Sequence, residues 1–214
     1  MRGENAMYEK IKKAAIGSML AASLCGGSAN AQTYGSVEGI VSAETGNSYV
    51  RPSVAYQLPY DFKGFSFAEL YKEGYLGSSV ISRKLNDNVD LMFKHYFSDK
   101  FDSKIAAGLS VNKDIYGVNA NAYALPFVAD KNSQLESMAL GYRVSKELPW
   151  GMNVSGFGEA SLSRKGLTWG YGELSLDKKL TDNLTISYVP ALYNSGAAKL
   201  TPNYEHRVSA KWTF

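Results

Sequence analysis

The segment from Tyr204 to Phe214 alternates between two kinds of side chain. Its even positions are largely apolar or aromatic: Tyr204, His206, Val208, Ala210, Trp212 and Phe214. Its odd positions are all polar: Glu205, Arg207, Ser209, Lys211 and Thr213. A period of two is typical of a β-strand whose two faces meet different surroundings. The segment is therefore expected to be a strand with one apolar and one wet face.

The N-terminus has the pattern of a targeting segment. Three lysines at positions 10, 12 and 13 precede an apolar run from Ala14 to Leu24. The run has the length of a signal-peptide core and is too short to cross a bilayer as a helix. Ala29 and Ala31 then provide the small residues of a cleavage site. Residues 1–31 are therefore expected to be a cleaved signal peptide, and residues 32–214 the mature domain.

Cys25 is the only cysteine of the chain and falls inside this expected signal peptide. A lipoprotein signal, in which a cysteine becomes the acylated N-terminus, is the alternative interpretation. Leu24 argues against it, because that pattern has a small residue at this place. The mature domain is thus expected to contain no cysteine, which excludes disulfides, thiol catalysis and thiolate metal sites.

The mature part has no apolar run near the ~20 residues that a membrane-spanning helix needs. Backbone groups in hydrocarbon must pair within the protein, so a chain without such helices can cross a bilayer only as a closed barrel. The 15 tyrosines, 9 phenylalanines and 20 glycines of the chain suit a barrel with an aromatic outer surface. Its formal net charge of +3 indicates no bias toward nucleic acid.

Turn signals recur at short intervals and alternate between two sets. The first set, expected to be periplasmic, comprises residues 58–61, 86–88, Asn112-Lys113-Asp114, 149–151 and 181–183. The second set, expected to face outward, comprises residues 45–47, 73–74, 98–100, 129–132, 164–166 and 194–196. Together they predict an all-β, up-and-down antiparallel barrel of twelve strands. Ten strands is the alternative, while eight would require longer loops than this spacing allows.

The terminal strand that closes on Phe214, together with the signal segment, resembles the targeting and insertion signals of Gram-negative outer-membrane β-barrel proteins. The resemblance implies export through the Sec pathway to the bacterial outer membrane. It also implies contact with the barrel-assembly machinery during insertion, and with lipid and lipopolysaccharide afterwards. In size and inferred strand number the chain is similar to the small monomeric porins for acidic oligosaccharides. No motif of that family can be matched, so no functional residue is carried over.

In each strand every second residue belongs to the polar face. The charged residues on these polar faces are the candidate lining of a lumen. The expected solute path comprises Arg51, Lys94, Lys104, Arg143, Glu159, Glu173, Glu205, Arg207 and Lys211, and Glu38, Glu69 and Asp90 share the inward parity. Lys94, Arg143, Arg207 and Lys211 would form a cationic track that attracts anionic solutes. Alternatively, these charges pair across strands and fill a narrow barrel.

The chain contains a short internal repeat: residues 156–162 (GFGEASL) are similar in sequence to residues 170–176 (GYGELSL). The alternation places Phe157, Glu159, Tyr171 and Glu173 on one face and the glycines on the other. The glycines are interpreted as places where strands bend and neighbouring aromatic rings find room. An aromatic and carboxylate patch along a ligand path is the alternative.

Signs of catalysis are weak. Both histidines, His95 and His206, lie on the apolar parity of their strands, and no serine has an evident histidine and acid partner. No cofactor, metal site or nucleic-acid motif is expected. The leading hypothesis is therefore a porin-like channel for passive diffusion of small hydrophilic, including anionic, solutes. A closed structural or interaction barrel is the second hypothesis. A barrel enzyme, a hydrolase or acyltransferase acting on lipid or peptide, is the third.

Overall fold

The computed structural model describes residues 33–44, 46–99, 103–129, 135–164, 166–193 and 203–214. The expected signal peptide, with Cys25 and the cleavage site at Ala31, lies outside the described residues. Within the described residues, no helix has the length and apolar character required to span a membrane.

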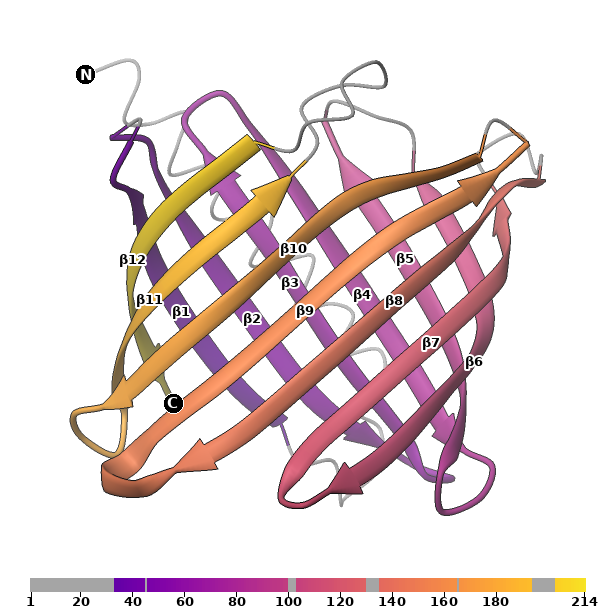
Figure 1. Ribbon diagram of the computed structural model, residues 1–214, viewed down its shortest axis with the longest axis horizontal. Helices are drawn as coiled ribbons and strands as arrows, with labels where there is room; N and C mark the ends of the chain where they lie inside the picture. Colours follow the sequence, from indigo (N-terminus) through magenta and orange to yellow (C-terminus); the bar gives the residue numbers. More distant parts are fainter. Residues whose placement is uncertain (1–32, 45, 100–102, 130–134, 165, 194–202) are drawn as a thin grey trace.

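The described residues form a closed barrel of twelve antiparallel strands in sequential order, as predicted (Figure 1). The strands are β1 (Thr33–Ser42), β2 (Ser48–Leu58), β3 (Phe62–Tyr71), β4 (Gly74–Lys84), β5 (Val89–Ser98), β6 (Lys104–Ile115), β7 (Val118–Ala129), β8 (Leu135–Leu148), β9 (Met152–Ser163), β10 (Gly166–Lys179), β11 (Leu184–Tyr193) and β12 (Asn203–Thr213). A 3₁₀ turn at Pro149–Gly151 joins β8 to β9. The ten-strand alternative is wrong.

The two ends of the barrel differ in their connections. One end, here the turn end, carries the five connections that lead from an even-numbered to an odd-numbered strand, and β1 starts and β12 finishes there. The other, the loop end, carries the six connections that lead from an odd-numbered to an even-numbered strand. In Figure 1 the turn end is at the bottom, where the C-terminus also lies.

One predicted turn is wrong. Asn112-Lys113-Asp114 lies inside β6, and the chain reverses at Tyr116-Gly117, where both φ angles are positive (53° and 76°). Positive φ at both central residues is characteristic of a tight two-residue hairpin. Asp114 supports the turn by accepting a hydrogen bond from the backbone N–H of Gly117 (3.0 Å). Asn112 instead donates its side-chain amide to Asp90 (2.8 Å), so its polarity serves the barrel interior.

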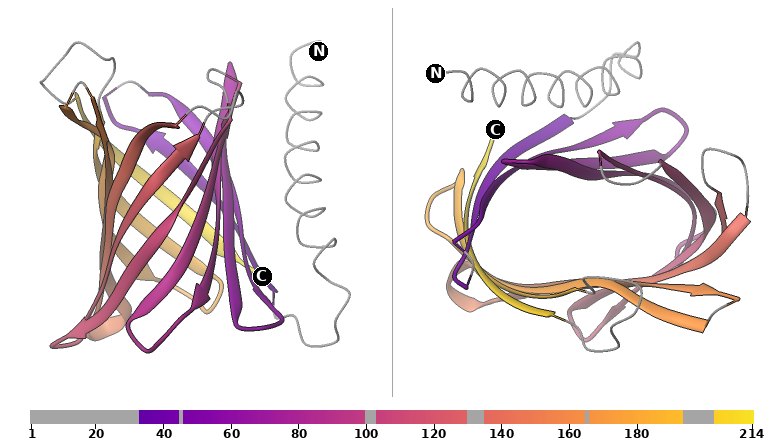
Figure 2. Two further views of the ribbon diagram at one scale, coloured as in Figure 1. Left: turned by 90° about the vertical axis from the view of Figure 1, so that its right-hand side faces the viewer. Right: turned by 90° about the horizontal axis from the view of Figure 1, so that it is seen from above.

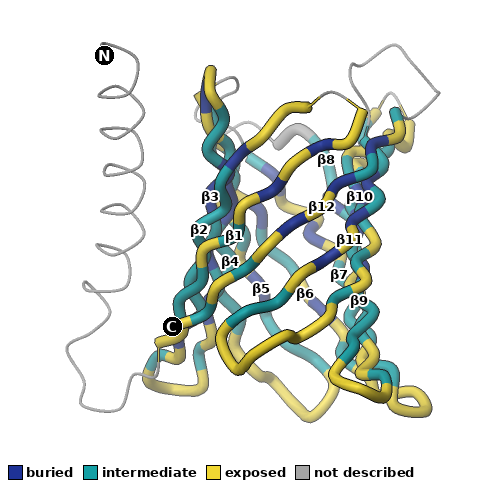
Figure 3. The backbone as a smooth tube through the Cα atoms, turned by 90° about the vertical axis from the view of Figure 1, so that its left-hand side faces the viewer, coloured by how far each residue is buried: buried dark blue, intermediate teal, exposed yellow. Residues whose placement is uncertain are grey.

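Strand β12 closes the barrel by pairing with β1, from Ser36 opposite Thr213 to Ser42 opposite Arg207. The backbones of Gly35 and Phe214 exchange two hydrogen bonds, of 3.0 and 3.2 Å. The predicted faces of this strand are confirmed: Arg207 and Ser209 are 7% and 3% exposed, whereas Phe214 is 72% exposed. Buried and exposed positions likewise alternate along the strands (Figure 3). The wet face of β12 therefore points into the barrel.

The ring of strands is oval when seen along the barrel axis (Figure 2, right). The segments β1 to β4 and β8 to β10 form the two longer walls. Because the walls approach one another across the shorter dimension, long side chains from opposite walls can meet inside.

Aromatic rings cover two of the four glycines of the internal repeat, Gly158 and Gly172. The Trp169 ring lies where a Cβ at Gly158 or Gly172 would be placed, at 2.6 and 2.5 Å. Its indole N–H donates to the backbone carbonyl of Leu192 (3.2 Å). The interpretation of the glycines as room for neighbouring rings thus holds at Gly158 and Gly172, whereas Gly156 and Gly170 lie against backbone atoms of the adjacent strand.

Gly108 and Gly39 provide a test of the backbone packing. A Cβ at Gly108 would lie 2.1 Å from the carbonyl oxygen of Ala124, at the bulge between β6 and β7, whereas a Cβ at Gly39 would meet nothing within 4 Å. Because backbone cannot move aside like a side chain, we expect Gly108→Ala to lower the free energy of unfolding by about 1–3 kcal/mol. Gly39→Ala should leave it unchanged or raise it slightly. Urea unfolding of both variants in detergent would measure this, and equal stability would contradict the bulge geometry.

Candidate functional site: a bridged lumen

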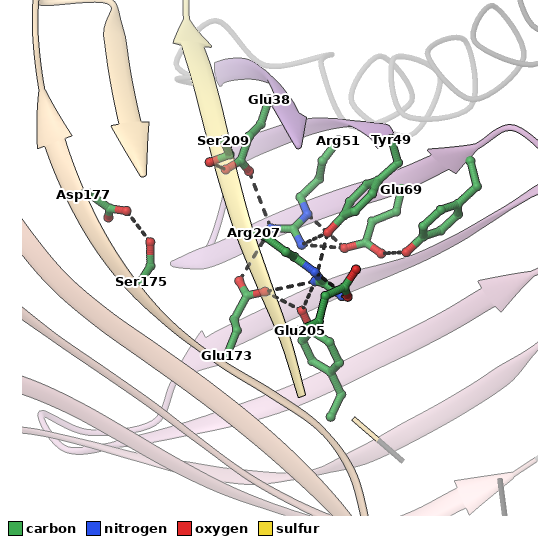
Figure 4. Close-up of polar contacts among 12 residues, drawn as sticks. Glu38, Tyr49, Arg51, Glu69, Glu173, Ser175, Asp177, Glu205, Arg207 and Ser209 are labelled. Carbon is green, nitrogen blue, oxygen red and sulfur yellow. Dashed lines mark hydrogen bonds and ion pairs between the residues drawn. The ribbon is translucent and has the colours of Figure 1, made fainter. Parts of the chain in front are cut away.

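The charged side chains of inward parity lie on the same face as Arg207 and Ser209, which the register defines as the interior. Two groups of these side chains form ion pairs across the lumen. The arginine cluster comprises Glu38, Tyr49, Arg51, Glu69, Tyr71, Tyr171, Glu173, Glu205, Arg207 and Ser209 (Figure 4). The lysine cluster comprises Lys94, Tyr96, Tyr123 and Glu159.

Arg51 is the centre of the arginine cluster. Its guanidinium lies 2.5 Å from Glu69, 3.5 Å from Glu38 and 3.5 Å from Glu173. The Arg51 side chain is 16% exposed, and the three carboxylates are 8–13% exposed. The single positive charge of Arg51 is therefore shared among three carboxylates that are shielded from solvent.

Arg207 occupies a similar position on β12. It contacts Glu205 on the same strand (2.5 Å) and lies 3.9 Å from Glu173. It also donates hydrogen bonds to the hydroxyls of Tyr49 (3.0 Å) and Tyr171 (2.7 Å). The cluster thus contains four carboxylates, of Glu38, Glu69, Glu173 and Glu205, against two guanidiniums.

The contact between Arg51 and Glu173 spans the lumen. Arg51 comes from β2 and Glu173 from β10, and three strands separate these two along the wall. Figure 4 shows the side chains meeting between strands of the two walls. The sequence predicted ion pairs between the charged side chains of neighbouring strands. The structure also contains an ion pair between strands on opposite sides of the lumen.

The lysine cluster makes a second crossing. Lys94 on β5 contacts Glu159 on β9 at 2.6 Å. The same carboxylate accepts hydrogen bonds from the hydroxyls of Tyr96 (2.7 Å) and Tyr123 (2.5 Å). The Lys94 ammonium lies over both rings, 4.6 and 5.4 Å from their centroids. This cluster is neutral, with its carboxylate held by three donors.

Apolar side chains fill the interior beside the lysine cluster. Ala106 and Leu125 are 0% exposed, and they pack with Met92, Val128 and Ala139. Val80, Tyr96 and Tyr123 cover the group. Inward apolar residues on β5 to β8 thus close part of the lumen. The alternation of polar residues along the strands would by itself have predicted that this part is open to water.

Two cavities open among the polar residues. The first, about 110 Å³, lies against the arginine cluster. Its lining includes Ser155, Ser175, Asp177, Ser187 and Lys211. The second, about 280 Å³, includes Arg143 and lies near the turn end.

The other predicted lining residues are more isolated. The Arg143 guanidinium lies over the ring of Phe65 (5.8 Å to the centroid). Neither Arg143 nor Lys211 has a carboxylate within 4 Å among the described residues. Lys104 is paired in register with Tyr96 at the loop end of the barrel. A continuous cationic track is therefore not assembled, because Lys94 and Arg207 are engaged by acids.

The two histidines lie outside the lumen. His95 packs beside Phe97 on the outer face, and His206 contacts the Tyr188 hydroxyl (2.5 Å) and the Glu44 carboxylate (3.8 Å). Over the described part of the chain, no group of three His, Cys, Asp or Glu residues could hold a metal ion.

Asp177 and Ser187 are lining residues that the sequence did not single out. Asp177 accepts hydrogen bonds from Ser175 and from the Asn153 amide. The alternation along β10 could have identified it, since Asp177 shares the parity of Glu173. Ser187 is a small residue among polar neighbours and carried no distinguishing signal.

Comparison with solved structures agrees with this architecture. The "KdgM porin" structure matches with a TM-score of 0.59 and 10% sequence identity, over 85% of this chain and 99% of that one. The "NanC porin" structure matches with a TM-score of 0.57 and 9% identity, over 83% and 98% of the two chains. The fold is that of the small outer-membrane porins. Such a barrel implies the bacterial outer membrane.

A third structure holds the KdgM porin "in complex with disordered oligogalacturonate" (TM-score 0.58, 10% identity). It covers 85% of this chain and 99% of that one. No protein-family model matches the chain, and no curated protein matches its sequence. At this identity the likeness establishes the fold and leaves the solute open.

Proposed function

We propose that the barrel is a narrow channel for passive diffusion of small hydrophilic solutes across the bacterial outer membrane. The observation that carries this proposal is a charged, hydroxyl-rich interior with open cavities of about 110 and 280 Å³ inside a closed membrane barrel. Side chains that served only to fill a barrel would be expected to leave less polar open volume.

The lumen charges do not favour a strong preference for anions. The twelve inward charged residues predicted from the sequence comprise six acidic and six basic ones, and Asp177 adds a seventh carboxylate to the lining. Arg143 and Lys211 are the cations available to attract an anionic solute, because Arg51, Lys94 and Arg207 are paired with acids. A polyanion would have to compete with the carboxylates already bound.

A closed structural or interaction barrel is the second candidate. The two cross-lumen ion pairs, Arg51–Glu173 and Lys94–Glu159, favour it because each joins two strands that are not neighbours in the barrel. The enzyme alternative receives less support: within the described residues His206 contacts a tyrosine and a glutamate, and no serine completes a hydrolase triad.

The route to the membrane is part of the proposal. Residues 1–31 would direct Sec export and be removed, and the barrel-assembly machinery would insert residues 32–214. The outward aromatic residues Tyr188, midway along β11, and Tyr204, at the loop end of β12, would then meet lipid and lipopolysaccharide.

Recording from the purified protein in planar bilayers tests the channel. We expect small, stepwise conductance increments, because the charged clusters narrow the lumen. Heat-denatured protein in the same detergent is the control for leakage. Absence of steps from folded protein would reject the channel and leave the closed barrel.

A further inference from the structure

The two cross-lumen ion pairs divide the interior into unequal parts. Arg51–Glu173 joins β2 to β10 at 3.5 Å, and Lys94–Glu159 joins β5 to β9 at 2.6 Å. Strands β11, β12 and β1 lie beyond the first pair, and β6, β7 and β8 lie beyond the second. We call these regions of the lumen the β12 side and the β7 side.

The β7 side is closed by apolar packing beside the lysine cluster, and the cavity of about 280 Å³ lies only at its turn end. Its inward residues include Ala106 and Leu125, both 0% exposed, and Val128 and Ala139, both 4% exposed. The hydroxyl of Ser110 on β6 is buried there without a hydrogen-bond partner among the described residues. Ser110 is 1% exposed, so its side chain is shielded from the open lumen.

The β12 side holds the cavity of about 110 Å³, which is large enough for several water molecules. Hydroxyls of Ser155, Ser175 and Ser187 line it together with Lys211. In Figure 4, Ser175 and its partner Asp177 stand apart from the arginine cluster. The open polar volume beside the first ion pair therefore belongs to this side.

The charges around this cavity are largely satisfied by the protein. Arg51 contacts three carboxylates, and Arg207 contacts two. Displacing these partners would leave shielded carboxylates unpaired, which is costly. Serine hydroxyls both donate and accept hydrogen bonds, so they match the hydroxyls of an uncharged polyol without breaking any ion pair.

We propose that the permeation path runs along the β12 side, through this cavity, and that it admits small uncharged polyols in preference to sugar acids. The proposal rests on the channel function proposed above and adds the position of the path and the class of solute.

Two matched serines allow the position to be tested. Ser187 and Ser110 both point inward and are 4% and 1% exposed, but Ser187 lines the cavity and Ser110 lies on the packed side. In a full-length Cys25→Ser background, Ser187→Cys and Ser110→Cys would be treated with a small, water-soluble, cationic methanethiosulfonate. Mass spectrometry would measure modification of the folded barrels, and planar bilayers would measure conductance.

We expect the thiol at 187 to react at least an order of magnitude faster than that at 110, which requires local opening. Its modification should lower conductance about twofold or more, because the reagent occupies the path. Equal labelling rates, or unchanged conductance after complete modification at 187, would overturn the position of the path while the channel stands. Absence of conductance in the unmodified protein would overturn the channel and the path together.

Liposome swelling tests the solute class. Galactose and galacturonate share a ring size and differ in a carboxylate, so they form a matched pair of solutes. We expect galactose to enter faster, and glycerol faster still. Faster entry of galacturonate would overturn the preference for uncharged polyols, even if labelling places the path on the β12 side.

Discussion

Replacement of Arg51 by methionine is expected to destabilise the barrel by about 3–5 kcal/mol, the range for removing one partner of a buried ion pair. Methionine fills much of the same volume but leaves Glu38, Glu69 and Glu173 without the cation they share. Urea unfolding in detergent, followed by the fluorescence of the 3 tryptophans, would measure the change.

Lys84→Met is the matched control for this loss of positive charge. Lys84 contacts Asp87 at 2.8 Å, but both side chains are exposed, at 54% and 92%. The neighbouring ammonium lowers the pKa of the Asp87 carboxyl through a hydrogen bond, yet solvent screens the pair and its loss should change stability little. The double variant Arg51→Met/Glu69→Gln should recover part of the loss. Equal stability of R51M and wild type would show that the carboxylates are hydrated and do not depend on Arg51.

Shortening Glu173 to serine is expected at least to double the single-channel conductance, because it removes the carboxylate that meets Arg51 across the lumen. The arginine cluster has four carboxylates for two guanidiniums, so the loss of one leaves no cation unpaired and should cost little stability. The same change makes the cluster less negative, and the reversal potential in a salt gradient should shift toward anions.

Glu205→Ser separates the effect of charge from that of the bridge. Glu205 contacts Arg207 on its own strand, at 2.5 Å, and does not cross the lumen. We expect it to shift ion preference as Glu173→Ser does, with a smaller gain in conductance. Equal gains from both variants would argue that charge, rather than the bridge, limits flow.

The fold was largely predictable because its signals are local. The alternation along Tyr204–Phe214 can be recognised from a few neighbouring positions. The same holds for the turn residues that recur at short intervals. The turn at Asn112-Lys113-Asp114 was wrong because Asn and Asp also serve inward hydrogen bonds, and nothing local to residues 112–114 reveals that Asn112 meets Asp90.

The candidate site was predictable only in part. Parity correctly assigns Arg51, Lys94 and Glu173 to one face, since each lies on a strand with a clear period. It does not show which of them meet. Arg51 and Glu173 are separated by 121 intervening residues and three intervening strands, and their contact depends on the register of every strand between them and on the oval section.

The sequence by itself therefore determined that the chain forms strands, how many, and which face of each is polar, because a two-residue period records the surroundings of each strand. The tertiary structure decided that the inward charges pair across the lumen and that apolar residues of β5 to β8 fill part of it. It also decided that one polar cavity lies beside β12 and another at the turn end of β6 to β8. Those outcomes depend on the distances between opposite walls, which barrel closure sets and no local pattern contains.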